Sequence, residues 1–490
     1  MSQTEYEAVI GLEVHAQLST ATKIFGGASS AFGARPNSQV SAGCWGMPGT
    51  LPVLNRHAVT LAIRAGLALG CTINERSVFD RKSYFYPDLP TGYQISQHDE
   101  PICLGGGVPY VVEGVTKFGA LNRIHLEQDA GKSVHAPEIG KSCIDLNRAG
   151  AALVEIVSEP VLHSAEDAVA YLRELRAILM AVGANDGNMN EGKLRCDANV
   201  SVRPKGSTKL GTRAEVKNLN SFRNLRDAIN YEIKRQVETI EAGGTLVQET
   251  RLWNDERGMS FSMRRKETMN DYRYFPDPDI PPLVVSPQWI EDVRASMPEL
   301  PAAARRRLQE VLGLSEYDAG LVVDTPGFTA ILDAAVATGA GAKTVVNLLS
   351  GPILAAVNEG QVRLDDASGA YTSERGHALD PKALGDLARL QESGTLSVVL
   401  ARKVLDEMLA SGRGPEAIVE QDGLQQSTDT SEIDAWIDQA FATAPAEVEA
   451  WRAGRKKVFG VILGHVMRAS GARANPEMVR KRLTERLEGN

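Results

Sequence analysis

Tyr6–Thr20 reads YEAVIGLEVHAQLST, and this stretch decides the fold of the N-terminal part of the chain. Apolar and polar side chains alternate along it, with the period of two that is typical of a β-strand. The apolar set is Ile10, Leu12, Val14, Ala16 and Leu18, and the other set is Gly11, Glu13, His15 and Gln17. We therefore expect one buried face and one face that presents acid, imidazole and amide groups.

The same alternation recurs further along the chain. It is found in Arg123–Asp129 (RIHLEQD), Leu153–Glu159 (LVEIVSE), Lys193–Arg203 (KLRCDANVSVR) and Arg213–Lys217 (RAEVK). These stretches are predicted to be antiparallel strands with one polar face. Helical spacing of apolar residues predicts packing helices over Arg56–Gly70, after Ser164 and after Ser221. The predicted fold class is α+β, with a mainly antiparallel sheet and packed helices in the N-terminal domain.

Acidic residues gather on the polar faces of these strands, interleaved with Arg and Lys. They are Glu13, Glu127, Asp129, Glu155, Asp197 and Glu215. For any single strand, a face in contact with water is the simpler interpretation. Carboxylates brought close together raise each other's pKa unless cations lie among them. Magnesium takes one or two protein carboxylates together with substrate phosphates. The sharper hypothesis is therefore a magnesium-phosphate site on the sheet.

Proline marks the main domain boundary. Five prolines lie between Phe275 and Pro287, where neither a helix nor a central strand can continue. At 490 residues the chain is too long for one core. We expect a sheet domain over residues 1–290, an all-α helical domain over 291–410 and a small basic helical tail domain over 411–490.

Composition describes an ordinary globular protein, with 43% hydrophobic and 23% charged residues. The start, MSQTEYEAVI, has no basic or long apolar region, and no stretch reaches the roughly 18 uninterrupted apolar residues of a membrane span. We therefore expect no membrane contact and a cytoplasmic location. The five cysteines are odd in number and widely spaced, which argues against a disulfide framework or a zinc cluster within the chain.

Charge is unevenly distributed although the net charge is −9. Residues 421–450 carry seven acids and no Lys or Arg, whereas residues 451–490 carry ten Lys and Arg against three Glu. A basic end on an acidic protein suggests a local contact with a polyanion. A solvated basic helix is the alternative interpretation.

Two loops carry candidate phosphate contacts. Phe79–Ser96 places Lys82, Tyr84 and Tyr86 near prolines, which suits phosphate, base or sugar contacts but also an ordinary surface loop. The sequence AGKS at 130–133 is not a Walker motif, because the first glycine of that motif is missing and no long helix is expected to follow. Lys132 can still reach phosphate, since it follows the acids of the preceding strand.

Long blocks of the sequence carry a resemblance that runs essentially from end to end. They include VIGLEVHAQL (9–18), GMPGTLPVLN (46–55), RKSYFYPDLPTGYQISQ (81–97), HLEQDAGKS (125–133), DLNRAGAALVEIVSEP (145–160), MNEGKLRCDANVSVR (189–203), EVKNLNSFR (215–223) and DYRYFPDPDIPPL (271–283). In these blocks the chain resembles the B subunits of the tRNA-dependent amidotransferase, the GatB family. Residues 452–483 resemble the tail domain of that family.

The resemblance implies an ATP-dependent ligase that forms a carbon–nitrogen bond. It implies that the side-chain carboxylate of Glu-tRNA(Gln) or Asp-tRNA(Asn) is phosphorylated by ATP, and that ammonia then displaces the phosphate. The ammonia would come through a channel from the glutaminase, GatA, in a complex that also contains a small third protein, GatC (GatCAB). The resemblance names the first domain a catalytic cradle and directs the tail toward the tRNA. Mg2+ and ATP are the implied cofactor and co-substrate.

Site residues follow from the resemblance at matching positions. The implied metal ligands are His15, Glu127 and Glu155, and the second-site candidates are Glu13, Glu191, Asp197 and Glu215. Glu13, Lys132 and Arg148 are the implied catalytic residues, and Lys82, Tyr84 and Tyr86, with Arg148, are the implied ATP or phosphate contacts. The expected tRNA contacts are Arg455, Lys456, Lys457, Arg473, Arg480 and Lys481. Many family members have a zinc-holding Cys-x-x-Cys pair where this chain reads Ser41-Ala-Gly-Cys44, so we expect no zinc.

Two other classes of function compete with this interpretation. A non-catalytic scaffold that docks tRNA beside the glutaminase predicts that Glu127→Gln leaves ATP hydrolysis unchanged. A magnesium-dependent nuclease also uses clustered acids and predicts cleavage of bare tRNA.

Overall fold

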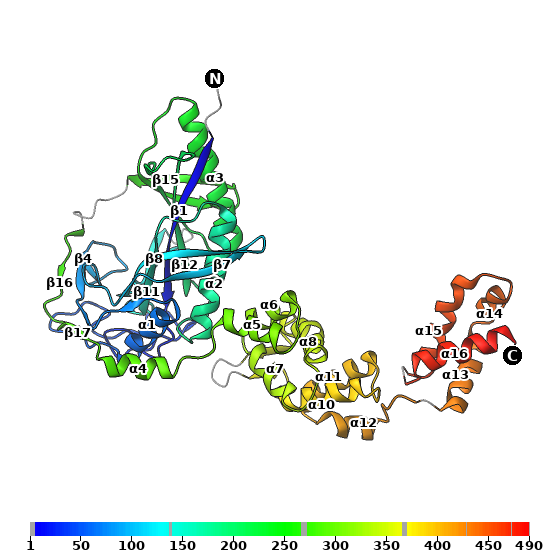
Figure 1. Cartoon of the computed structure of the whole chain (residues 1–490). Coiled ribbons are helices and arrows are strands. Elements are labelled where there is room, and N and C mark those ends of the chain that lie inside the picture. Colours follow the sequence, from blue (N-terminus) through cyan, green and yellow to red (C-terminus); the bar gives the residue numbers. More distant parts are fainter. Residues whose placement is uncertain are drawn as a thin grey trace. The chain divides into compact units, whose positions relative to one another are not determined.

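A ten-stranded sheet organises the first of two compact units, residues 1–301, of the computed structural model (Figure 1). The structure describes residues 5–136, 140–265, 272–364, 370–427, 429–471 and 473–489. The strand order is β15-β14-β13-β12-β1-β11-β8-β6-β2, and β7 also pairs with β8. The strands are β1 (Tyr6–Gln17), β2 (Thr72–Ile73), β6 (Cys103–Leu104), β7 (Gly107–Val112), β8 (Val115–Gln128), β11 (Ala152–Ser158), β12 (Leu194–Pro204), β13 (Ala214–Lys217), β14 (Glu249–Asn254) and β15 (Met259–Arg265).

β1 lies in the middle of this sheet, between β11 and β12, and both pairings are antiparallel. Its predicted apolar face is buried, since Ile10, Leu12, Val14 and Ala16 are at most 1% exposed. On the opposite face, Glu13, His15 and Gln17 are partly exposed, whereas Gly11 is buried. The α+β class and the predicted two-sided strand are therefore confirmed.

One pairing departs from the expected antiparallel pattern. β13 and β14 run parallel, because the connection between them contains the helix α3 (Phe222–Glu241). Parallel neighbours require such a crossover. The Ser221 side chain caps α3 by accepting a hydrogen bond from the Asn224 N–H (3.0 Å), so the predicted helix start is confirmed.

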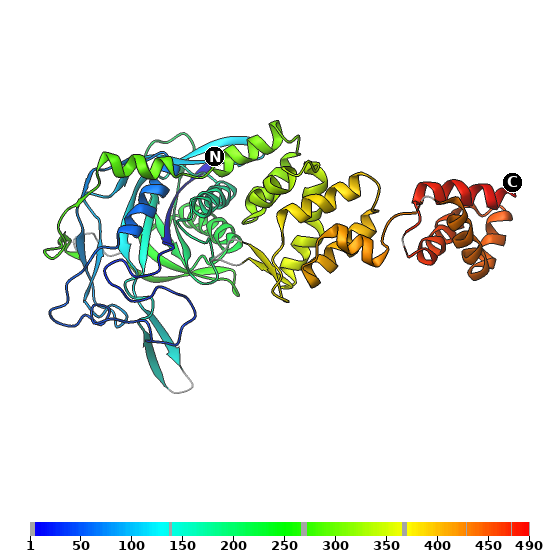
Figure 2. The same ribbon diagram turned by 90° about the horizontal axis from the view of Figure 1, so that it is seen from below.

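Three helices cover the apolar face: α1 (Arg56–Ala68), α2 (Ala165–Ala181) and α3. Residues from all three belong to one hydrophobic cluster with β1, among them Ile63, Leu172 and Leu225. α2 and α3 lie side by side along the sheet (Figures 1 and 2). These three helices therefore leave the polar face of the sheet uncovered.

Smaller elements complete the first unit. They are β3 (Arg76–Ser77), β4 (Asp80–Ser83), β5 (Tyr93–Ser96), β9 (Lys132–Ala136), β10 (Lys141–Asp145), β16 (Phe275–Pro276), β17 (Leu283–Val284) and α4 (Pro287–Ala295). β4 pairs with β5 and β16, and β3 with β17. The β9–β10 hairpin projects from the rest of the unit (Figure 2).

The second unit, residues 302–490, is mainly helical. Its helices are α5 (Pro301–Glu310), α6 (Glu316–Asp324), α7 (Phe328–Val336), α8 (Ala342–Leu348), η3 (Leu349–Ile353), α9 (Leu354–Asn358), α10 (Pro381–Glu392), α11 (Val398–Ser411), α12 (Pro415–Asp422), α13 (Thr430–Thr443), α14 (Pro445–Arg452), η4 (Lys456–Val458), α15 (Phe459–Ala469) and α16 (Pro476–Glu488). A short hairpin of β18 (Val362–Leu364) and β19 (Tyr371–Ser373) interrupts the region that was expected to be all-α.

Two separate hydrophobic clusters lie in this unit, one from Leu308 to Val419 and the other from Ile433 to Leu487. The division into domains over 1–290, 291–410 and 411–490 stays a prediction. In the described part of the chain, no single helix is long and apolar enough to cross a membrane; only the pair α6 and α7 passes that test together, with a 117° bend between its members.

Candidate functional site

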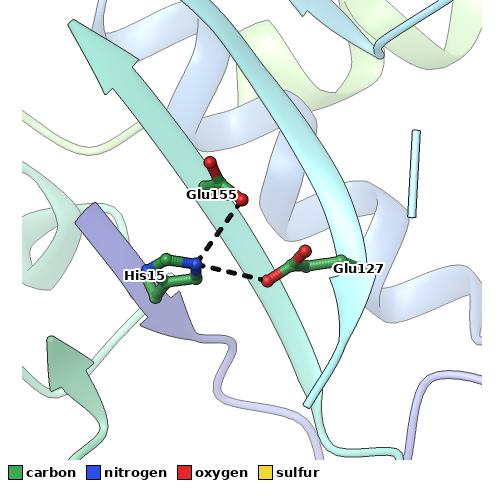
Figure 3. Close-up of side chains that lie close together, drawn as sticks. All are labelled: His15, Glu127 and Glu155. Atoms are coloured by element: carbon green, nitrogen blue, oxygen red, sulfur yellow. Dashed lines mark ion pairs between the residues drawn. The ribbon is translucent and has the colours of Figure 1, made fainter. Parts of the chain in front are cut away.

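Three side chains converge on the polar face of the sheet. The register places His15 of β1 opposite Glu155 of β11, and Glu155 opposite His125 of β8. Glu127 is two residues beyond His125 and therefore shares its face of β8. Figure 3 shows His15, Glu127 and Glu155 pointing toward one another from three neighbouring strands.

Distances in this triad suit a shared cation. His15 Nε2 lies 3.5 Å from Glu127 Oε1 and 3.4 Å from Glu155 Oε2. One ligand atom of each side chain falls within 4.8 Å of the others. Among the described residues this is the only set of three or more His, Cys, Asp or Glu side chains whose ligand atoms converge in this way. The three residues that the resemblance implied as metal ligands are thus brought together.

Charge is tightly coupled within the triad. Burial on its own lowers the pKa of His15, but the hydrogen bond to Glu155 and the charges of Glu155 and Glu127 outweigh it and raise the pKa to about 9. Burial on its own raises the pKa of Glu155, but His125 and His15 outweigh it and hold that pKa well below its usual value. Without a bound metal ion, the protonated imidazole of His15 therefore lies between the carboxylates of Glu127 and Glu155. A metal ion can take over the positive charge when His15 loses its proton.

His125 was missed as a site residue by the sequence reasoning, which singled out His15. It is 3% exposed, and its Nε2 lies 3.3 Å from Glu155 Oε2 and 3.9 Å from Glu127 Oε2. The alternation placed His125 on the acidic face, but the pattern could not reveal that β8 pairs with β11 and brings His125 opposite Glu155. His125 is in position to orient the carboxylates.

Lys82 lies among aromatic rings beside the triad's acids. Its Nζ is 4.8 Å from the centre of the Tyr272 ring and 6.0 Å from that of Tyr84. Burial on its own lowers the pKa of Lys82, but its neighbours Tyr274, Glu127 and Glu155 outweigh it and raise the pKa. Lys82 is therefore a permanent cation close to the acids.

The aromatic rings form a connected cluster. Tyr84 makes edge contacts with Tyr86 and Tyr272, at 5.8 and 6.1 Å between ring centres. Tyr274 stacks on His98 at 4.2 Å. Tyr272 and Tyr274 were not predicted as site residues, because only the fold brings the segment before β16 against β4 and β5.

Arg148 is held by three contacts to the residues that follow β8. It donates to the carbonyl oxygens of Ala130 (3.1 Å) and Gly131 (2.7 Å), and its Nε lies 3.3 Å from Asp129 Oδ2. Arg195 also pairs with Asp129, at 2.9 Å. Lys132 begins β9 and is exposed. The assignment of Arg148 and Lys132 as catalytic residues stays a prediction.

Within the described residues, the ligand atoms of the second-site candidates do not converge with those of the triad. Lys217 Nζ is 2.5 Å from Asp197 and 3.3 Å from Glu215, and Glu13 accepts a 2.8 Å hydrogen bond from Asn199. These acids therefore already interact with a lysine or an amide.

Glu191 is not on a strand; it lies in the turn before β12, where it pairs with Lys193 at 2.8 Å. The use of Glu13, Glu191, Asp197 and Glu215 at a second metal site stays a prediction.

The predicted tRNA contacts of the tail fall on two elements and the turn between α15 and α16. Arg455, Lys456 and Lys457 are at η4, Arg473 precedes α16, and Arg480 and Lys481 are in α16. Lys456 lies over the Trp451 ring at 3.1 Å, and Arg473 over the Trp436 ring at 5.6 Å. Arg480 and Lys481 line a hollow on α16. Their role in tRNA binding stays a prediction.

Comparison with known proteins places these elements in a family. Residues 8–291 match the GatB/GatE catalytic domain, and residues 330–487 match the GatB domain. A protein of Geotalea uraniireducens (strain Rf4), named as the B subunit of aspartyl/glutamyl-tRNA(Asn/Gln) amidotransferase, is 51% identical over 488 residues, which cover 99% of this chain and all of that protein. A Geobacter sulfurreducens protein of the same name is 52% identical over 487 residues with the same coverage. The converging triad lies within the matched catalytic domain, and this chain belongs to the GatB family of tRNA-dependent amidotransferase subunits.

Proposed function

We propose that the polar face of the sheet is the place where this protein activates the side-chain carboxylate of a misacylated tRNA. As the B subunit of a glutamine-dependent amidotransferase, the chain works in a ligase that uses ATP to form a carbon–nitrogen bond. The substrates are Glu-tRNA(Gln), Asp-tRNA(Asn) or both, and the partners are the glutaminase GatA and the small protein GatC. The cytoplasm is the proposed location.

The convergence of His15, Glu127 and Glu155 is the observation that carries this proposal. Two carboxylates and one imidazole would bind a divalent cation and leave other coordination positions open for phosphate oxygens. Mg2+ is the proposed ion. When bound there, the ion would neutralise charge on the phosphates of ATP.

Lys82 and Arg148 would act on the phosphoryl group. A carboxylate is a poor acylating agent, because attack by ammonia would have to expel oxide, and phosphorylation converts that oxygen into a leaving group. Phosphoryl transfer depends mainly on positioning and on neutralising negative charge. The half-buried cation of Lys82 and the anchored guanidinium of Arg148 would supply both. Tyr84 and Tyr86 are proposed to contact ATP beside Lys82.

Assays of the reconstituted complex of all three proteins test this function. With Glu-tRNA(Gln), ATP and ammonium, Glu127→Gln is expected to abolish both release of ADP and formation of Gln-tRNA(Gln). The glutaminase activity of GatA and the binding of tRNA serve as controls and are expected to persist. A complex that hydrolyses ATP at the normal rate with Glu127→Gln would contradict the proposal and favour a scaffold, and cleaved tRNA would favour a nuclease.

A further inference from the structure

Lys23 is buried in the first unit without a carboxylate partner. Only 2% of the surface of Lys23 is exposed. The ammonium group donates to Leu146 O at 3.2 Å and to Cys44 Sγ at 3.1 Å, and it forms no ion pair with an acid in the described part of the chain. A buried cation without a counter-ion is costly. The group next to it that can become an anion is the Cys44 thiol.

The surroundings of Cys44 favour its thiolate. Ser41 Oγ lies 3.4 Å from Cys44 Sγ. Burial on its own raises the pKa of Cys44, but hydrogen bonds from Ser41 and Lys23 and the charge of Lys23 outweigh it and lower the pKa. At Cys71, Cys103 and Cys196 burial also raises the pKa, and there no neighbour outweighs it.

Lys23 and Cys44 face a cavity. Lys23, Ser41 and Cys44 line it together with Tyr93 and Asp129. Asp129 is engaged with Arg195 on the polar face, so it does not neutralise Lys23. Cys44 is half-buried, whereas the other three cysteines with shifted pKa are buried. Partial exposure beside a cation is the setting of reactive cysteines.

We propose that Cys44 is a modification site at which a small soft oxidant, a peroxide, is reduced by a thiolate that Lys23 holds. The thiolate sulfur attacks one peroxide oxygen, a sulfur–oxygen bond forms and the oxygen–oxygen bond breaks. With hydrogen peroxide, the sulfur loses two electrons and becomes a sulfenic acid, and the leaving hydroxide takes up one proton to become water. His15, Glu127 and Glu155 are not among the described residues that line this cavity, and the proposal does not rest on the proposed carboxylate activation.

Peptide mass spectrometry after exposure of the full-length chain to hydrogen peroxide tests this site. A dimedone-type reagent traps sulfenic acids, and Cys143, which is exposed in the same molecule, is the internal control. We expect trapping at Cys44 to be several-fold faster than at Cys143 at pH 7. Faster trapping at the more exposed Cys143 would overturn the proposal.

Three variants separate the effect of the cation from that of folding. Lys23→Met is expected to slow trapping at Cys44 to the rate of Cys143 or below, and Lys23→Arg is expected to preserve it. Ser41→Ala removes a hydrogen bond without burying new bulk, so partial slowing is expected even if Lys23→Met does not fold. Circular dichroism checks the fold of each variant. Unchanged trapping at Cys44 in folded Lys23→Met, or in Ser41→Ala, would contradict the proposed role of these neighbours.

Discussion

Individual residues of the triad couple proton binding to cation binding. His15 must lose its proton before its Nε2 can bind a metal. Because the pKa of His15 is raised from 6.5 to about 9, the protonated form dominates at neutral pH in the unliganded protein. We expect the affinity for Mn2+, used as a spectroscopic substitute for Mg2+, to rise as the pH increases toward 9. Titrations monitored by electron paramagnetic resonance at several pH values would measure it.

The control for this prediction is His15→Asn, which removes the titrating group. Its metal affinity is expected to be lower and to vary less between pH 7 and pH 9. Equal pH dependence in the variant and in the wild type would show that another group titrates.

His125 is expected to orient Glu155 without binding substrate. His125→Leu removes the 3.3 Å contact and leaves His15 to hold the carboxylate of Glu155 without it. Loss of such an orienting partner weakens metal binding by about 10- to 100-fold. Isothermal titration with Mn2+ would measure the loss, and partial recovery in His125→Gln would support a role as hydrogen-bond donor. His57→Leu, at an exposed histidine of α1, is the matched control and is expected to bind normally.

At the scale of elements, the central strand carries the stability of the first unit. Leu12 is 1% exposed in β1, within the cluster that joins the sheet to its three helices. Leu12→Ala is expected to lower the free energy of unfolding by about 2–5 kcal/mol. Chemical denaturation followed by circular dichroism would measure the change. Leu210 is 55% exposed, so Leu210→Ala is the control. It is expected to change the free energy of unfolding by less than about 0.5 kcal/mol.

Strands and helices were more predictable from sequence than the contacts between them. The alternation in β1 and the Ser221 cap are local signals, and both predictions are confirmed. The parallel pairing of β13 and β14 depends on where α3 packs, which no local pattern contains. In the same way, the pairing of His125 with Glu155 follows from strand order, which the sequence leaves open.

For the whole molecule, the basic tail is expected to supply affinity for tRNA and no chemistry. Arg480 and Lys481 lie on α16 in the tail, away in sequence from the catalytic domain that residues 8–291 match. The double variant Arg480→Ala/Lys481→Ala is expected to weaken tRNA binding and to reduce the slope of log affinity against log salt by about 1–2. Filter binding of the reconstituted complex at several salt concentrations would measure both.

Arg402→Ala/Lys403→Ala provides the matched control, because it removes an adjacent exposed basic pair from α11. It is expected to leave the salt slope unchanged. Equal losses in the two double variants would point to net charge as the cause and would contradict a specific tail contact. In both variants, ADP release at saturating tRNA is expected to match that of the wild type.

The central position of β1 also affects how the chain is made. β1 is synthesised first, but its two neighbours are β11 and β12, which end at residues 158 and 204. At about 5–20 residues per second, a ribosome needs roughly 10 to 40 seconds to reach the end of β12. Of the elements that cover the apolar face, only α1 is made early, and neither edge of β1 has its final partner before residue 158. We therefore expect the first strand to be prone to aggregation in the nascent chain until β11 and β12 have been made.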